Sequence, residues 1–364
     1  MTEPRLAVVA AGGTGGHLFP AQALSQALAA RGWRIVLASD ERVERLGADF
    51  PAERRIPLSA ATFKPGDPLG AVKAGAAILK GVMQARAELA ALKPAVVVGF
   101  GGYPSLPALM AAISQGRRTL IHEQNAVMGR ANRLLAPRVT AIACAFPTLQ
   151  KAPASVQARA VVVGNPVRPA IQVLYEAPYA APDGEFRLLV TGGSQGARLL
   201  SETVPRAVAL LPEGLRARLK VQQQTRAESL DVARRTYDDA GVEAETAPFF
   251  DNIAERLAAA HLVIGRAGAG TVCEIAVAGR PAIFVPLKIA LDDDQGQNAR
   301  LLAEAGAAEV LREDAFSDAA LAAVLQRLLD APEKLAAMAA AAHAAARPDA
   351  ADRLADVVEG VAEK

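Results

Sequence analysis

Residues 5–17 read RLAVVAAGGTGGH, and residues 187–198 read RLLVTGGSQGAR. Each stretch is a short apolar run that leads directly into glycines and then into a helical pattern. This order is typical of a buried strand, a tight turn and a helix packed against the strand. Because the arrangement occurs twice in a chain of 364 residues, the sequence predicts two similar α/β units.

Short apolar runs alternate with longer helical patterns, such as 20–30, through the rest of the chain. Runs such as VVVGF (96–100) and AIFVP (282–286) are apolar throughout, as expected of parallel strands covered on both faces. The predicted strands are 5–10, 34–39, 95–99, 119–122, 141–143, 160–163, 187–191, 219–223, 262–265, 282–285 and 308–311. This pattern predicts an α/β fold of two doubly wound, Rossmann-like domains that face each other across a cleft.

The bulk properties exclude several classes of protein. The 40 basic residues nearly balance the 38 acidic ones, and aromatic residues make up only 4%, so nucleic acid is not expected as a partner. The two cysteines lack the spacing of a disulfide framework, and the four histidines lack the spacing of metal ligands. No apolar run reaches the roughly 18 residues that a membrane span needs, so we expect a protein that is soluble or peripheral.

Glycine-rich turns occur at four places, 12–17, 101–105, 192–198 and 265–271. Such a turn exposes backbone N–H groups at the start of a helix and suits an anion or a sugar, although any single turn can also serve only tight packing. The dinucleotide pattern G-x-G-x-x-G is absent from 13–18, and 265–271 lacks the lysine of a nucleotide-triphosphate loop. The turns therefore favour a diphosphate or a sugar.

The turn at 265–271 leads into Thr271-Val272-Cys273-Glu274, and two interpretations remain open for it. In one, Thr271 and Glu274 form a capping box that satisfies the first amides of a helix. In the other, Glu274 accepts hydrogen bonds from two ribose hydroxyls.

Seven motifs in order resemble one family. They are GGTGGH (12–17), FGGYPS (100–105), HEQN (122–125), GNPVR (164–168), GGSQGAR (192–198), the glycine turn leading to Glu274, and DDDQGQNA (292–299). Together they resemble the MurG family of bacterial N-acetylglucosaminyltransferases. The resemblance implies a GT-B fold and an inverting transfer of N-acetylglucosamine from UDP-GlcNAc to the C4 hydroxyl of the muramoyl sugar of lipid I, giving lipid II and UDP. No cofactor and no metal are expected.

The resemblance also implies a division of labour. Residues 1–164 would form a domain for the acceptor and the membrane, 165–348 a linker and the UDP-GlcNAc domain, and 349–364 a helix that packs back on the first domain. The implied setting is peripheral, on the anionic cytoplasmic face of the inner membrane, with proteins of cell-wall synthesis and division as further partners.

Site residues follow from the matching motif positions. Those expected near the reacting sugar and the acceptor diphosphate are Thr14, Gly15 and Gly16, and those expected around the donor are Asn125, Arg168, Ser194, Gln195, Phe250, Gly268, Ala269, Thr271, Glu274 and Gln295. The chain departs from the family at Ala267–Thr271, where a Ser-Gly-Ala-Leu-Thr sequence is usual, and at Asp294, where histidine is common.

The chemistry needs a base for the incoming hydroxyl and positive charge for the departing diphosphate. His17, at the end of the first glycine turn, is the candidate base, with capping of that turn as its alternative role. His122-Glu123 is a second candidate pair, which we expect instead to shape the HEQN loop. Arg168 and the helix after Gly270 would stabilise the leaving group. The acidic run 292–294 is the rival metal site, but such a run is typical of a solvated loop.

Residues 69–86 read LGAVKAGAAILKGVMQAR and combine apolar with basic side chains. Val72, Ile78, Leu79, Val82 and Met83 lie there among the basic residues Lys64, Lys73, Lys80 and Arg86. This composition suits a helix on an anionic membrane surface, or equally an amphipathic helix packed on a sheet. Other readings of the whole chain are a transferase with a different lipid acceptor, a UDP-GlcNAc 2-epimerase, and a non-catalytic nucleotide-sugar sensor.

Overall fold

The computed structural model describes residues 4–12, 15–40, 50–61, 66–193, 196–288 and 292–363. Within these residues the chain forms two compact units. The first comprises the described residues up to Arg168 together with those from Asp349 onward, and the second runs from Pro169 to Pro348. The boundary therefore follows Arg168 rather than residue 164, and the chain ends in the unit in which it begins.

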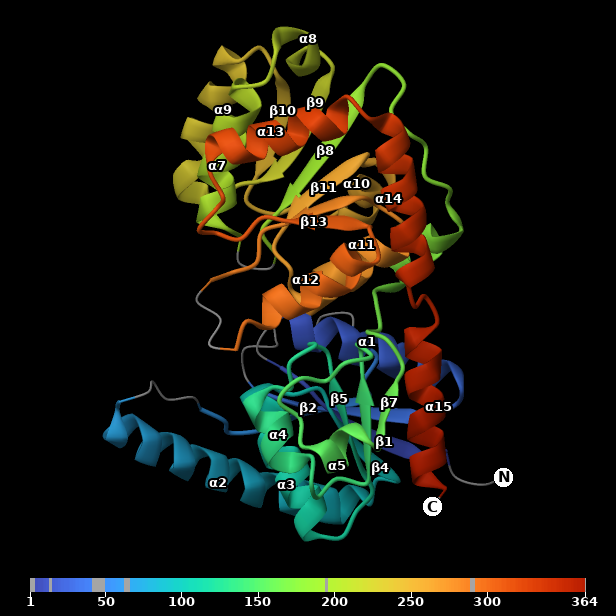
Figure 1. Ribbon diagram of the computed structural model, residues 1–364. Helices are drawn as coiled ribbons and strands as arrows, with labels where there is room; N and C mark the ends of the chain where they lie inside the picture. Colours follow the sequence, from blue (N-terminus) through green and yellow to red (C-terminus); the bar gives the residue numbers. More distant parts are fainter. Residues whose placement is uncertain are drawn as a thin grey trace. The chain divides into compact units, whose positions relative to one another are not determined.

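The first unit is a parallel sheet with helices on both faces (Figure 1). Its strands are β1 (Leu6–Ala10), β2 (Arg34–Ser39), β3 (Arg54–Pro57), β4 (Val96–Gly99), β5 (Thr119–Glu123), β6 (Ala141–Cys144) and β7 (Ala160–Val162). Its helices are α1 (Gly15–Ala30), α2 (Pro68–Leu92), α3 (Gly102–Ser114), α4 (Arg130–Leu135), α5 (Ala154–Gln157) and α15 (Ala350–Ala362). The strands lie in the order β3-β2-β1-β4-β5-β6-β7, which is a doubly wound order.

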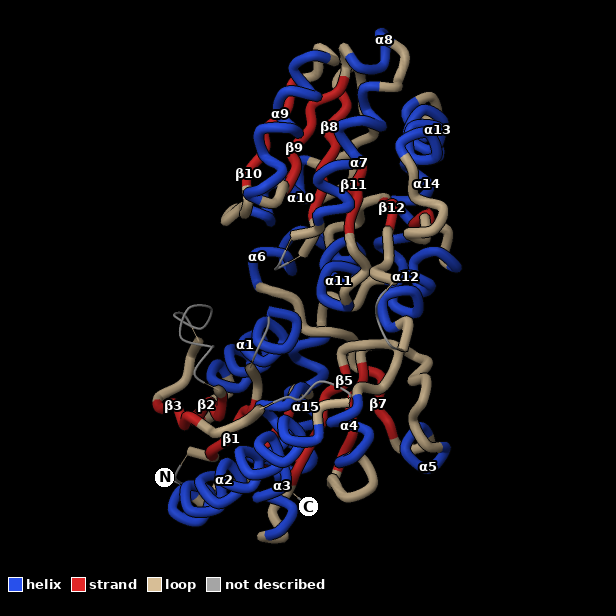
Figure 2. Tube along the Cα trace, turned by 90° about the vertical axis from the view of Figure 1, so that its left-hand side faces the viewer, coloured by secondary structure: helices blue, strands red, loops and turns tan. Residues whose placement is uncertain are grey.

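The second unit repeats this architecture, as the strands in Figure 2 show. Its strands are β8 (Phe186–Thr191), β9 (Leu219–Gln224), β10 (Glu243–Ala247), β11 (Leu262–Gly265), β12 (Ala282–Phe284) and β13 (Ala308–Val310). Its helices are α6 (Pro169–Gln172), α7 (Arg198–Ala209), α8 (Glu213–Arg216), α9 (Leu230–Asp239), α10 (Ile253–Ala259), α11 (Ala269–Val277), α12 (Asp294–Glu304), α13 (Asp318–Leu329) and α14 (Pro332–Ala345), with short 3₁₀ turns at Val173–Glu176 and Ala227–Ser229. The strand order is β10-β9-β8-β11-β12-β13. As in the first unit, the strand that comes first in the chain, here β8, lies inside the sheet, and the strands that follow it are added first on one side and then on the other.

The predicted fold class is confirmed, and the reason is visible in β1. Val8 and Ala10 belong to one buried cluster and Ala7 and Val9 to another, so both faces of the strand are covered. Every predicted strand is present, with its ends within one residue of the expected position. The predicted start of the first helix at residue 20 was wrong, because α1 begins at Gly15 and contains Pro20 in its second turn.

The four glycine-rich turns fall in pairs at equivalent positions in the two sheets. Turns 12–17 and 101–105 follow β1 and β4, and turns 192–198 and 265–271 follow β8 and β11. In each sheet these two strands are neighbours at the point where the strand order reverses. Ligands of doubly wound folds bind beyond the carboxyl ends of the strands at such a point, so the fold itself selects these turns.

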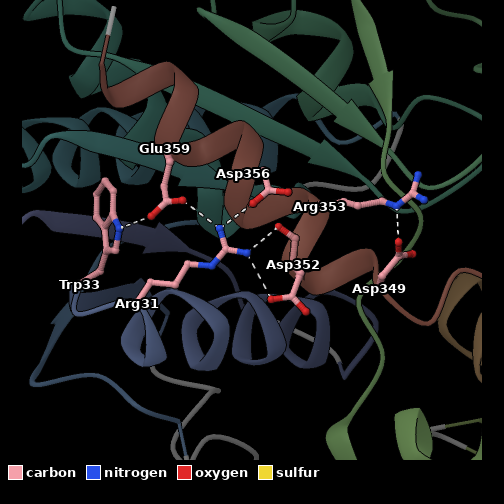
Figure 3. Close-up of polar contacts among 7 residues, drawn as sticks. All are labelled: Arg31, Trp33, Asp349, Asp352, Arg353, Asp356 and Glu359. Atoms are coloured by element: carbon pink, nitrogen blue, oxygen red, sulfur yellow. Dashed lines mark hydrogen bonds and ion pairs between the residues drawn. The ribbon is translucent and has the colours of Figure 1, made fainter.

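Helix α15 is fastened to the first unit by both apolar and charged contacts. Leu354 and Val358 join the apolar cluster beneath α1. At the rim, Arg31 forms ion pairs with Asp352 at 3.2 Å, Asp356 at 2.6 Å and Glu359 at 2.8 Å (Figure 3). The indole Nε1 of Trp33 donates to the other oxygen of Glu359 at 3.1 Å.

Helix α2 packs one face on the sheet and leaves the opposite face exposed. Small residues such as Gly81 and Ala85 are buried on the inner face, and a Cβ at Gly81 would lie 2.1 Å from the carbonyl oxygen of Ser59. Ile78 and Val82 also pack against the core, as in the alternative of an amphipathic helix packed on a sheet, whereas Val72, Leu79 and Met83 are exposed. The spacing of 78, 81, 82, 85 and 89 puts these side chains on one side of the helix. Lys64 lies outside the described residues.

Candidate functional site

His17 joins the first and second glycine-rich turns. It is the third residue of α1, and its side chain is half-buried. Its Nε2 atom lies 3.3 Å from the point where a Cβ would stand on Gly102, a residue with φ of +69°. Only glycine combines that backbone conformation with the space that the imidazole needs, so the second turn is shaped around His17.

A chain of hydrogen bonds connects His17 to the interior of the first unit. The Nδ1 atom of His17 lies 3.0 Å from Oε1 of Gln124. Nε2 of Gln124 lies 3.1 Å from Nδ1 of His122 and also donates to the backbone oxygen of His122 at 3.0 Å. Nε2 of His122 faces the backbone oxygen of Gly164 at 2.9 Å.

The buried end of this chain determines the tautomer at the exposed end. Burial lowers the pKa of His122 to about 4, so this imidazole is neutral at pH 7. Its Nε2 faces a carbonyl and therefore carries the hydrogen, which leaves Nδ1 as an acceptor for the amide NH₂ of Gln124. The amide oxygen of Gln124 then faces His17, whose Nδ1 must donate. Neutral His17 consequently has its lone pair on Nε2.

Glu123 organises the loop that carries Asn125. The Glu123 carboxylate accepts hydrogen bonds from the backbone N–H of Asn125 at 3.0 Å, from that of Gly129 at 2.9 Å and from Nδ2 of Asn132 at 2.8 Å. Glu123 is buried directly at the end of β5. These hydrogen bonds confirm the prediction that Glu123 shapes the HEQN loop.

Arg168 is the last residue of the first unit and lies against α1. Its guanidinium stands over the ring of Phe19, 4.9 Å from the centroid. This cation–π contact connects Arg168 to the helix that carries His17, Gly15 and Gly16. Thr14, the remaining predicted residue of the first turn, lies outside the described residues.

A hollow of about 410 Å³ opens beside α2 in the first unit. Asp40, Ser59, Lys80 and Gln84 contribute polar groups to its lining. The carboxylate of Asp40 connects it to the first turn, because Oδ1 lies 3.3 Å from the point where a Cβ would stand on Gly12. The first unit therefore has space and polar groups next to its glycine-rich turns.

In the second unit, Gln224 ties two of the expected donor segments together. Its Oε1 accepts from the backbone N–H of Gly192 at 2.9 Å, and its Nε2 donates to the backbone oxygens of Gly193 at 3.0 Å and Pro248 at 3.2 Å. Phe250 follows on that second segment and lies under the guanidinium of Arg256. Gln224 belongs to no sequence motif and was therefore not predicted as a site residue. Ser194 and Gln195 lie outside the described residues.

The third turn differs from the expected capping box. Gly268 is the N-cap of α11 and makes no side-chain capping bond, so the helix begins at Ala269 and Thr271 lies within its first turn. The capping-box interpretation was therefore wrong: the extended backbone of Gly268, with ψ of 144°, starts the helix before Thr271 is reached. The first N–H groups of α11 point out of the helix start, as an anion site requires, and Glu274 is half-buried on the second turn.

Gln295 lies at the start of α12 and contacts the segment after β12. Its Oε1 accepts from the backbone N–H of Leu287 at 3.0 Å. In the preceding acidic run, Asp293 forms an ion pair with Arg312. Across the described ranges, no group of three or more histidine, cysteine, aspartate or glutamate side chains is placed to hold a metal ion.

Family models match both units. Residues 7–144 match the glycosyltransferase family 28 N-terminal domain, and residues 187–354 match the glycosyltransferase family 28 C-terminal domain. The chain belongs to glycosyltransferase family 28. The members of this family are enzymes. All four glycine-rich turns lie within the matched ranges.

Relatives place the chain within this family. It is 68% identical over 360 residues, 98% of this chain and 99% of the other, to a protein of Phenylobacterium zucineum named UDP-N-acetylglucosamine–N-acetylmuramyl-(pentapeptide) pyrophosphoryl-undecaprenol N-acetylglucosamine transferase. The crystal structure of Acinetobacter baumannii MurG superposes with a TM-score of 0.79 at 32% identity, covering 98% of this chain and 100% of that one. This family 28 member therefore has the GT-B fold of the MurG family.

The fold alone does not decide the reaction. The structure of UDP-GlcNAc 2-epimerase from Neisseria meningitidis, solved with UDP-GlcNAc bound, superposes with a TM-score of 0.67 at 13% identity, covering 98% of this chain and 100% of that one. A family 28 transferase and an epimerase thus share one architecture. The side chains at the turns must distinguish them.

Proposed function

We propose that this chain transfers N-acetylglucosamine from UDP-GlcNAc to the C4 hydroxyl of the muramoyl sugar of lipid I, with inversion at the anomeric carbon, forming lipid II and UDP. The observation that carries the proposal is the 68% identity, over both units, to a transferase whose name states this donor and this acceptor. The arrangement around His17 supports it, since that residue has the tautomer of a base.

In the proposed reaction His17 is the general base. Its Nε2 removes the proton of the C4 hydroxyl while the C4 oxygen bonds to C1 of the donor sugar. The bond between C1 and the phosphate oxygen breaks, and UDP leaves with that electron pair. Gln124 accepts from Nδ1–H of His17 at 3.0 Å and so supports the imidazolium that forms. A positioned base contributes about 10²–10⁴ in rate.

Positive charge and backbone N–H groups would stabilise the departing diphosphate. Arg168 and Ser194 are assigned to this region, where a charge-assisted hydrogen bond is worth about 1.5–3 kcal/mol. The start of α11 adds about 0.3–2 kcal/mol for an anion at its N-terminal end. In the first unit, the backbone of Thr14, Gly15 and Gly16 is assigned to the acceptor diphosphate.

The second unit would hold most of the donor. Phe250 offers backbone to uracil, while Gly268, Ala269 and Thr271 line the nucleotide. Glu274 would accept from the ribose hydroxyls, an assignment that no longer competes with a capping role because α11 begins before Thr271. Gln195 is assigned beside the diphosphate, and Gln295 and Asn125 to the hydroxyls of the transferred sugar.

A surface of α2 suits the membrane in which the acceptor is anchored. Figure 1 shows α2 lying along α3, with its N-terminal half extending beyond the rest of the first unit. Leu69, Val72, Leu79 and Met83 are 74%, 71%, 64% and 61% exposed, and their spacing places them on one face of the helix. We call these four side chains the apolar stripe.

Lysines flank the apolar stripe. Lys73 and Lys80 are exposed beside it, whereas Arg86 donates to Ser114 on α3. Exposed apolar side chains flanked by cations favour an anionic lipid surface. Where the structure describes the chain, no helix has the length and apolar character of a membrane span. We therefore propose peripheral attachment at the cytoplasmic face of the inner membrane, in company with proteins of cell-wall synthesis and division.

The test separates a transferase from an epimerase with the same fold. UDP release is measured with UDP-GlcNAc alone and with UDP-GlcNAc plus a lipid-linked muramoyl acceptor. The proposal predicts UDP only when the acceptor is present. UDP release or 2-epimerisation without the acceptor would favour the epimerase.

A further inference from the structure

Three consecutive charged residues after β13 each form an ion pair with a residue near the expected donor residues. Arg312 pairs with Asp293, Glu313 with Arg266 at 2.6 Å, and Asp314 with Lys288. All three pairs lie within the second unit. We call Arg312–Asp314 the clasp. None of its residues belongs to a sequence motif.

The segments that the clasp binds are those that carry the donor assignments. Arg266 lies directly between β11 and the glycine turn that starts α11. Asp293 is the N-cap of α12, the helix that presents Gln295. Lys288 follows Leu287, whose N–H donates to Gln295.

The Arg312–Asp293 pair lies across the first turn of α12. A Cβ on Gly296 would stand 2.4 Å from Oδ1 of Asp293 and 2.5 Å from Nη1 of Arg312, so the pair fills the space of a side chain at position 296. Nη2 of Arg312 donates to Oδ2 of Asp293 at 3.0 Å, which makes the contact bidentate. The hydrogen bonds from Arg312 hold the pKa of Asp293 below its ordinary value.

Asp293 also has an unusual backbone. Its φ of 51° lies in the left-handed region, which non-glycine residues adopt only when other contacts compensate. The bidentate grip of Arg312 is such a contact. The start of α12, and with it the position of Gln295, depends on this pair.

The Arg266–Glu313 pair fixes the glycine turn from beneath. The two side chains are only 11% and 17% exposed, and Arg266 also donates to the backbone oxygen of Val285 at 2.9 Å. The same turn also accepts a hydrogen bond from α12, because Nδ2 of Asn298 donates to the backbone oxygen of Ala267 at 3.2 Å. A buried guanidinium without its carboxylate is strongly unfavourable, so removal of Glu313 should displace the turn.

We propose that the clasp positions the donor site without touching the donor: Arg312 sets the affinity for the transferred sugar through Gln295, and Glu313 sets the affinity for the uridine diphosphate part through the glycine turn. The inference rests on the proposed function for the identity of the donor. Its physical content is that one tripeptide holds two connections of the second unit, the turn between β11 and α11 and the segment between β12 and α12. The clasp residues are therefore positioning residues.

The experiment measures UDP binding by calorimetry and steady-state kinetics for Arg312→Gln and Glu313→Gln. For Glu313→Gln we expect the Kd for UDP and the KM for UDP-GlcNAc to rise about tenfold or more, whereas for Arg312→Gln only the KM for UDP-GlcNAc should rise by this factor. In both variants kcat and the KM for the lipid acceptor should change less than about twofold. The double variant Asp293→Arg with Arg312→Asp restores the pair with reversed charges and should bring the KM for UDP-GlcNAc most of the way back to the wild-type value.

The matched control is Arg206→Gln. Arg206 and Asp318 form an ion pair at 2.8 Å in the same unit, with exposures of 50% and 35%, close to the 52% and 43% of Arg312 and Asp293. This control should leave UDP binding unchanged. The inference is overturned if Glu313→Gln binds UDP like the wild type and Arg312→Gln keeps the wild-type KM for UDP-GlcNAc, or if Arg312→Gln raises that KM and the charge reversal gives no recovery. Weakened UDP binding in a protein that never glycosylates the lipid acceptor would contradict the proposed function and leave the clasp standing.

Discussion

The Nδ1 atom of His17 lies 3.0 Å from the side-chain oxygen of Gln124, a residue 107 positions further along the chain. Because Gln124 is itself oriented by buried, neutral His122, the hydrogen of neutral His17 is placed on Nδ1 and the lone pair on Nε2. The same Nε2 lies over Gly102 in the second turn. This nitrogen thus lies where the first glycine-rich turn approaches the second.

Removing the acceptor of this hydrogen bond should slow the chemical step. Gln124→Leu leaves Nδ1 of His17 without a partner, so the tautomer and the ring orientation are no longer fixed. We expect kcat to fall about 10–100-fold, and His17→Ala to lower it about 10²–10⁴-fold, with the KM for UDP-GlcNAc nearly unchanged in both.

The double variant distinguishes positioning from a general loss of structure. If Gln124 acts through His17, Gln124→Leu should add little to the defect of His17→Ala. If the decreases in kcat of the two single variants multiplied fully in the double variant, Gln124 would act independently of His17, contrary to the proposal.

The depressed pKa of His122 should appear as a pH dependence of stability. Unfolded His122 takes up a proton below its ordinary pKa of about 6.5, whereas the folded residue does so only near pH 4. The contribution of His122 to the free energy of unfolding is therefore complete above about pH 6.5. It is lost as the pH falls toward 4, at up to about 1.4 kcal/mol per pH unit.

Urea unfolding of the first unit at pH 7 and pH 5 measures this slope. The single tryptophan, Trp33, lies in that unit and reports its unfolding by fluorescence. His122→Asn, although less stable at pH 7, should show a smaller loss between the two pH values. An unchanged slope in the variant would contradict the assignment of a neutral, buried imidazole.

Arg31 should contribute to the stability of the first unit by holding α15. Arg31→Gln leaves Asp352, Asp356 and Glu359 close together on one helix face without their cation, and we expect a loss of about 1–3 kcal/mol. The control is Arg353→Gln, because Arg353 pairs with Asp349 next to the start of the same helix at 2.6 Å, and such a pair is worth about 0.5 kcal/mol or less. Unfolding of both variants is monitored by Trp33 fluorescence. Equal losses of unfolding free energy would show that the ion pairs of Arg31 contribute no more than that of Arg353.

The apolar stripe and its lysines should govern binding to anionic vesicles. Replacing Leu79 and Met83 with serine, or Lys73 and Lys80 with glutamate, should lower cosedimentation with vesicles that contain phosphatidylglycerol. Activity on a soluble acceptor analogue should stay within about twofold, because the stripe faces away from the core. Leu210→Ser in the second unit, where Leu210 is 60% exposed, is the matched control. Undiminished vesicle binding in both α2 variants would exclude the stripe as the contact.

The interior of the fold could be predicted because its signals are local. Central strands such as β4 and β11 are buried on both faces and are written as continuous apolar runs. The edge strands β3 and β10 were missed because one reads RRIP and the other EAETA, with most of their residues exposed or half-exposed. The start of α1 was missed because proline is favoured at the first position of a helix, whereas Pro20 lies in the second turn of α1.

The candidate site was predictable only in part for a similar reason. The glycine-rich turns could be predicted, because clusters of glycines between an apolar run and a helical pattern are visible in the sequence. Gln124 stood inside the quoted HEQN motif, yet its contact with His17 spans 107 residues and needs the neighbouring positions of β1, β4 and β5. The clasp offers no sequence signal, since alternating charges are common on protein surfaces and only the packing at Gly296 distinguishes this one.

The proposed reaction is transfer of N-acetylglucosamine to a lipid-linked muramoyl acceptor with His17 as the base. The most direct measurement incubates the wild type and His17→Ala with UDP-GlcNAc labelled in the sugar and a lipid I analogue, and then determines the labelled product. We predict that the wild type places the label in the lipid as a β-1,4-linked disaccharide, and that His17→Ala does so at least about 100-fold more slowly. The proposed reaction would be contradicted if the label stayed out of the lipid, or if His17→Ala transferred it at the wild-type rate.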